Sequence, residues 1–134
     1  MTGQVIKKLL SESAELMELI PIDRIFPYVI NEGTPLPAMV YTIDTINPEY
    51  TKDGWANDTI SFSLIIFSEN YATLQQMITL SRLALDFKFG DIGITEEDTI
   101  KIGHIYFNSQ SEGYSLAEDA FLSRLSFTVN TYNY

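Results

Sequence analysis

The sequence predicts an α+β fold in which two helices pack on one face of an antiparallel four-stranded sheet, in the order α-β-β-α-β-β. Two segments carry apolar residues at helical spacing, and four others alternate or are rich in β-branched and aromatic residues. Of the 134 residues, 46% are hydrophobic and 19% are charged, which is typical of a globular protein. We therefore expect one domain, residues 1–134.

The first predicted helix, residues 2–20, leads into a segment stiffened by proline. In TGQVIKKLLSESAELMELI the apolar residues recur three and four positions apart. Residues 23–37 have no lasting period, and Pro27, Pro35 and Pro37 favour an extended backbone there. Proline fixes the backbone before folding, so this connection loses less entropy when it becomes ordered.

Two strands are predicted next, with a polar loop between them. AMVYTIDTI (residues 38–46) is rich in β-branched and aromatic residues, and TISFSLIIF (residues 59–67) alternates clearly. The turn-rich residues 47–58 predict a long loop. Ile65 and Phe67 interrupt the polar face of the second strand, which indicates either a patch buried between subunits or a site covered by a loop.

A second helix and two further strands complete the predicted fold. Leucine, methionine and isoleucine recur at helical spacing in residues 70–87. Strands are predicted at residues 99–107 and 120–132, separated by a polar loop at residues 108–119. The last strand has Arg124 and its alternate neighbours opposite an apolar face, so the sheet again has one polar side.

Charge and cysteine content narrow the class of protein. Eight Lys and Arg oppose eighteen Asp and Glu, which gives a net charge of −10 and no clustered cations, so specific nucleic-acid binding is not expected. The absence of cysteine excludes a disulfide framework. The first twenty residues mix charged with apolar residues, unlike a signal peptide, and favour a cytoplasmic protein with no membrane partner.

No catalytic or metal-binding motif is present. The Walker loop, G-x-S-x-G, G-x-G-x-x-G and C-x-x-C are all absent from the sequence. His104, the single histidine, lies in a predicted strand without an evident partner and is interpreted as structural. The acidic run at residues 95–98 lacks calcium-loop spacing and favours a solvated turn. We therefore predict no catalytic residue, no cofactor and no metal.

Trp55 is the only tryptophan, and it lies in a polar loop close to Tyr50. Either it folds back over the edge of the sheet, or it anchors a partner, since Trp and Tyr often carry interface energy.

Several of these segments together resemble the small tail terminator, or tail completion, proteins of long-tailed bacteriophages and prophages. The matching elements are R-I-F-P at residues 24–27, G-T-P-L-P at residues 33–37, and a strand that continues through Tyr71 into a long helix, residues 60–85. SRLSFTV, residues 123–129, resembles the last strand of the family. Residues 87–115 match no element of it.

The resemblance implies a non-enzymatic protein that forms a ring, commonly of six subunits. Such a ring caps the finished tail tube and joins it to the head connector, so the protein is expected in the bacterial cytoplasm during assembly and then in the virion tail or neck. Acidic charge suits a channel that passes DNA. The hypothesised interface residues are Arg24, Pro27, Pro35, Pro37, Tyr50, Trp55, Ile65 and Phe67.

Three alternatives remain open from the sequence. The first is another neck or connector protein of the same particle. The second is a small-molecule binding module or an unrecognised enzyme, with a pocket between helices and sheet, for which no convergent polar cluster is evident. The third is an acidic mimic of nucleic acid, which would need carboxylates gathered on one face, whereas they are spread along this chain.

Overall fold

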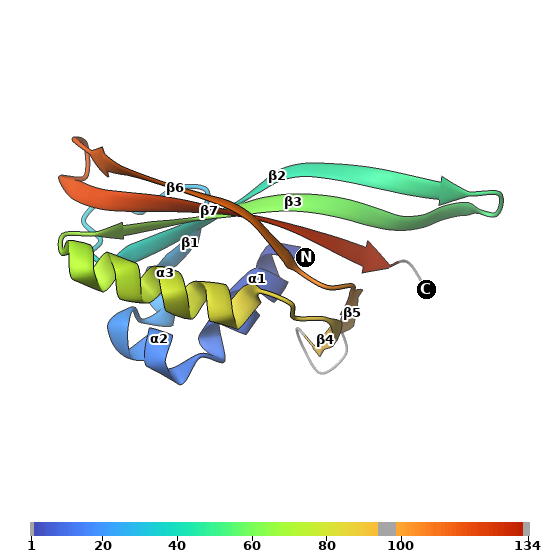
Figure 1. The fold of residues 1–134 in the computed structure, drawn as a ribbon, viewed down its shortest axis with the longest axis horizontal. Coiled ribbons are helices and arrows are strands. Elements are labelled where there is room, and N and C mark those ends of the chain that lie inside the picture. Colours follow the sequence, from blue (N-terminus) through green and yellow to red (C-terminus); the bar gives the residue numbers. More distant parts are fainter. Residues whose placement is uncertain (1, 94–98, 133–134) are drawn as a thin grey trace.

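A mixed seven-stranded sheet forms the body of the computed structural model (Figure 1). The structure describes residues 2–93 and 99–132, and only the backbone of residues 2, 55, 56 and 99. Along the sheet the strands are β1 (Ile25–Pro27), β2 (Ala38–Thr51), β3 (Gly54–Ser68), β7 (Ala120–Tyr132), β5 (Thr99–Ile102) and β4 (Gly90–Gly93). β6 (Tyr106–Ser115) pairs with β7 on the same side as β5.

The predicted antiparallel four-stranded sheet with two helices is therefore wrong. β1 runs parallel to β2, with Ile25 opposite Met39, and β4, for which the sequence predicted no element, pairs with β5. β1 has three residues and β4 has four, which is too short for a period to emerge. Their strand character comes from pairing with neighbours.

The predicted strand over residues 99–107 is divided, and the predicted loop at residues 108–119 is largely strand. β5 ends at Ile102, the chain turns through residues 103–105, and β6 then extends to Ser115. β6 is polar along its length and exposed at most positions, so hydrophobic alternation could not mark it.

Three α-helices lie on one side of the sheet: α1 (Thr2–Ser11), α2 (Ala14–Leu19) and α3 (Tyr71–Leu85), together with a short 3-10 turn, η1 (Ile22–Arg24). The single helix predicted over residues 2–20 breaks at residues 12–13. Ser13 caps α2 by accepting a hydrogen bond from the backbone N–H of Leu16 at 3.4 Å. A serine in extended conformation starts a new helix there rather than continuing the old one.

The core fills the space between these helices and the sheet. The apolar residues of β3 that alternate in the sequence are buried, as predicted: Ile60, Phe62, Leu64 and Ile66. At its centre Phe62 stacks on Phe127 of β7, with ring centroids 5.2 Å apart and 13° between the planes. The exposed faces of β2, β3 and β7 lie on the opposite side.

β2 and β3 form a long hairpin that projects beyond the helices (Figure 1). The loop predicted at residues 47–58 is wrong, because pairing continues to Thr51 and Gly54 and leaves only Lys52 and Asp53 in the turn. Gly54 has a φ of 116°, a conformation that side chains resist. Asp-Gly is a strong hairpin signal. However, Asn, Pro, Asp and Gly are depleted in strands, and their presence in residues 47–58 made this segment resemble a loop.

Candidate assembly surface

The sheet surface turned away from the helices, the open face, is polar at its centre. Residues opposite each other on paired strands share a face, and the register brings hydroxyl-bearing side chains together across three strands. The central open-face residues are Thr42, Thr45, Ser61, Ser63, Arg124, Ser126 and Thr128. No helix of the described residues lies over this surface, so the open face is a candidate contact surface.

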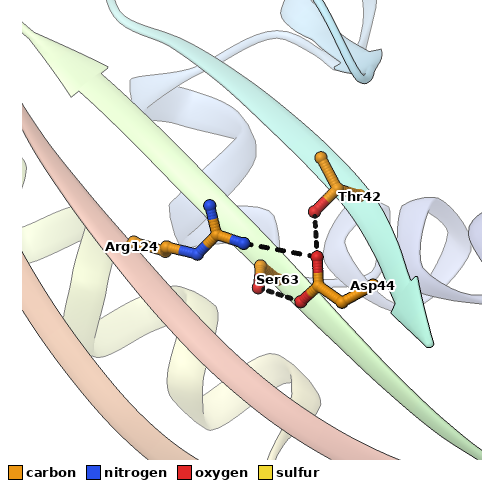
Figure 2. Close-up of polar contacts among 4 residues, drawn as sticks. All are labelled: Thr42, Asp44, Ser63 and Arg124. Atoms are coloured by element: carbon orange, nitrogen blue, oxygen red, sulfur yellow. Dashed lines mark hydrogen bonds and ion pairs between the residues drawn. The ribbon is translucent and has the colours of Figure 1, made fainter.

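Asp44 organises the middle of the open face (Figure 2). It is the extra residue at a β-bulge in β2, since Ile43 pairs with Phe62 and Thr45 with Ser61. A bulge redirects a side chain, and here the carboxylate accepts hydrogen bonds from the hydroxyls of Thr42, at 2.9 Å, and Ser63. The polar contacts therefore extend from β2 across to β3.

Arg124 of β7 reaches over β3 to the same carboxylate, and its Nη2 lies 3.3 Å from Oδ1 of Asp44. The two side chains are 46% and 33% exposed, so water screens the pair. An ion pair of this kind contributes about 0–1 kcal/mol to stability. The cluster therefore defines the chemistry of the open face more than it stabilises the fold.

One end of the open face is apolar and lies beside the proline-rich segment. Tyr28, Val29 and Ile30 border a cavity of about 370 Å³ together with Val40, Ile65, Phe67 and Glu118. Ile65 and Phe67 are half-buried there. In a single subunit these two side chains thus lie next to the proline-rich segment, and their role between subunits stays a prediction.

The remaining predicted interface residues lie along this segment and the hairpin. Arg24 ends η1 and Pro27 ends β1, while Pro35 and Pro37 precede β2. Pro27 and Pro35 are exposed, and Arg24 and Pro37 are half-buried. The structure therefore does not bring the predicted residues into one patch, because the hairpin carries its share of them away from the proline-rich segment.

Tyr50 lies near the tip of the hairpin, 72% exposed and opposite Trp55 in the register. The Trp55 side chain lies outside the described residues, so the hypothesis that it anchors a partner stays a prediction. The acidic run at residues 95–98 also lies outside the described residues.

Glu112 ties β6 to α3. Its carboxylate accepts hydrogen bonds from Gln75 Nε2 at 2.9 Å and from the Tyr71 hydroxyl at 2.7 Å. Two hydrogen bonds lower the pKa of Glu112, the one from Gln75 more than the one from Tyr71. The hydrogen bond between Tyr71 and Glu112 also raises the pKa of Tyr71. Charge-assisted hydrogen bonds thus hold the outer strand of the sheet against the helix.

An aromatic patch formed by Phe87, Phe89, His104 and Tyr106 is a feature that sequence reasoning missed. The His104 ring lies 4.4 Å from the Phe87 ring and 4.5 Å from the Phe89 ring, between centroids. Both phenylalanines are exposed, and Phe87 has a φ of 64°. Two phenylalanines at alternate positions just after a helix are the signal that could have revealed it.

The surroundings of His104 offer no catalytic partner among its ring contacts, which are all aromatic. Within residues 2–93 and 99–132, no three His, Asp or Glu side chains gather as metal ligands would. No helix in this part of the chain is long and apolar enough to cross a membrane.

Comparison with known proteins finds solved structures of similar fold. No protein-family model and no curated protein matches this chain. A chain in the solved structure described as the virion of a native gene transfer agent (GTA) particle has a similar fold, with a TM-score of 0.70 and 13% sequence identity. The likeness covers 96% of this chain and 92% of that one, so the two share a fold over nearly their whole lengths.

Proposed function

We propose that this protein is a structural component of a phage-like particle and, within it, the tail terminator: a ring that caps the tail tube and joins it to the head connector. The observation that carries the proposal is the fold shared with a chain of the GTA virion. The sequence elements that resemble the tail terminator family narrow this broader virion role to one position in the particle.

The surfaces described above suit a protein that acts by contact. A ring needs two different patches on each subunit, one meeting the other on the next copy. The projecting hairpin, the open face and the exposed proline-rich segment are candidates for such patches. The net charge of −10 suits a wall around a DNA channel, because like charge discourages adhesion.

The proposal is tested by adding the purified protein to tail tubes assembled without it. We expect a ring at one end of each tube in electron micrographs, and tubes that no longer elongate when more tube protein is added. A ring that binds an isolated head connector but not a tube would instead indicate another neck protein. Absence of binding to either would contradict the virion role.

A further inference from the structure

Besides the short terminal strands β1 and β4, two long strands of the described sheet have an edge without a partner. β1 covers the outer edge of β2 only from Met39 to Tyr41, and no described strand pairs with that edge from Thr42 to Thr51. β6 pairs with β7 on one side and with no described strand on the other. Such edges expose rows of unpaired backbone N–H and C=O groups, which are templates for pairing with another chain.

The edge of β6 carries little of the protection that exposed strands usually have, and the edge of β2 is protected at two positions only. Lysine, proline and bulges commonly block the edge of a sheet. The ten residues of β6 include no Lys, Arg or Pro, and its single bulge lies at Asn108, near its start. In β2, the bulge at Asp44 lies near the start of the free edge, and Pro48, which lacks an N–H, removes at most one hydrogen bond from a ladder along the rest of it.

We propose that β6 of one copy pairs antiparallel with the free edge of β2, residues 42–51, of a second copy, so that the sheet continues from subunit to subunit. β2, β3, β7 and β6 are successively antiparallel, so β6 runs opposite to β2. A neighbour in the same orientation therefore presents its β2 antiparallel to β6. Repeating this β6–β2 contact from copy to copy produces a ring or a filament. The choice of a second copy as the partner rests on the proposed ring.

The pleat of the sheet restricts the register of this pairing. A slip of one residue would move every side chain to the opposite face. On β6, Ser109 and Ser111 lie on the open face, opposite Ser126 and Arg124 of β7. On β2 the corresponding residue near the middle of the free edge is Asn47. The open face therefore continues across the junction only if Asn47 meets an odd-numbered residue of this part of β6.

Two further features select Ser111 as the residue opposite Asn47. β1 blocks β2 before Thr42, so β6 must lie toward the hairpin tip. With Ser111 opposite Asn47, the start of β6 at Tyr106 meets the turn at Lys52. Because Tyr106 belongs to the aromatic patch, this register places the neighbour's exposed hairpin tip beside the patch.

Disulfide cross-linking tests the pairing directly, because the chain has no cysteine of its own. Directly opposite residues in an antiparallel pair have Cα atoms about 4.5–5.5 Å apart, within the range that a disulfide spans. We expect a mixture of Asn47→Cys and Ser111→Cys chains to give an oxidised dimer in several-fold higher yield than Asn47→Cys with Gln110→Cys. Gln110 is the matched control, since it is exposed on the same strand but on the opposite face.

The outcomes separate this inference from the proposed function. Rings without the 47–111 cross-link, or equal yields from Ser111 and Gln110, would overturn the edge pairing and leave the ring intact. A specific 47–111 cross-link in a protein that never caps a tube would support the edge pairing and overturn the tail terminator role. A chain that stays monomeric and uncross-linked at all concentrations would contradict both.

Discussion

Phe62 is the residue whose loss should weaken the fold most among those described at the centre of the core. Its ring is fully buried and stacks on Phe127. We expect Phe62→Ala to lower the free energy of unfolding by about 3–5 kcal/mol, through lost burial and the cavity left behind. Urea denaturation measures the change. Phe67→Ala, on the open face and only half-buried, is the matched control, and an equal loss there would contradict the assignment of the core.

Glu112 gives stability a dependence on acidity. Its pKa in the folded protein lies below the usual value of a glutamate, because Gln75 and then Tyr71 donate hydrogen bonds to it, so its contribution is present above the usual value and is lost as the pH falls through the lowered pKa. We expect Glu112→Gln to melt below the wild type at pH 7, by a small margin because water screens an exposed carboxylate. The difference should shrink below pH of about 4.5.

Melting curves recorded across that pH range check the prediction for Glu112, with Tyr71→Phe as a companion variant. Tyr71→Phe removes one donor to the carboxylate and keeps the ring that packs edge-on against Phe121. It should reproduce part of the effect. A gap between wild type and Glu112→Gln that stays constant with pH would show that the carboxylate charge is not involved.

At the scale of the element, Asn70 starts α3. Its side-chain oxygen accepts a hydrogen bond from the backbone N–H of Thr73 at 3.1 Å. Asn70→Ala should cost about 0.5–2 kcal/mol of stability, whereas Asn70→Ser, another good cap, should cost much less. Chemical denaturation of the two variants tests this, and similar losses would mean that the cap is unimportant for α3.

The projecting half of the β2–β3 hairpin should matter for assembly and little for folding of the subunit. Residues 44–51 of β2 are exposed, so a shorter hairpin in which Asn-Gly replaces residues 49–57, between the paired Pro48 and Asp58, keeps the register and loses few core contacts. We expect its melting temperature to stay within a few degrees of the wild type while the concentration needed for oligomers rises at least tenfold. Sedimentation of the two proteins measures this.

A matched variant replaces the other hairpin turn, residues 116–119, with Asn-Gly and should assemble more readily than the shortened β2–β3 hairpin. If the shortened β2–β3 hairpin assembled at the wild-type concentration, the hairpin would have no role between subunits.

The elements differ in how far the sequence could predict them. α3 and the inner halves of β2 and β3 follow from strong periodicity, because each buries one face in the core. The outer hairpin, β6, β1 and β4 bury little or are very short, so no hydrophobic pattern marks them. The break between α1 and α2 depends on one serine, Ser13, whose capping role competes with an otherwise continuous helical pattern.

For the whole molecule, the segments that bury one face in the core were predictable, but the number of strands and their pairing were not. The parallel contact of β1 with β2 joins segments through a connection without regular period. The candidate surface was also predictable only in part. Polar alternation predicted an open polar face, but the contact of Asp44 with Arg124 depends on a bulge and on strand neighbours far apart in the chain. The exposed aromatic patch likewise joins residues on either side of β4 and β5.

The central position of β7 also sets the order in which the chain acquires its structure. β7 pairs with β3 along most of its length, joining positions as distant as Asn57 and Tyr132. A hairpin forms in about 1–10 μs, whereas sheets built on non-local pairs fold in roughly milliseconds to seconds. On the ribosome, we therefore expect the β2–β3 hairpin to begin to form before β7 is synthesised. During that interval the inner edge of β3 is open, so chaperones or misfolding partners meet β3 before they meet the edges of the finished sheet.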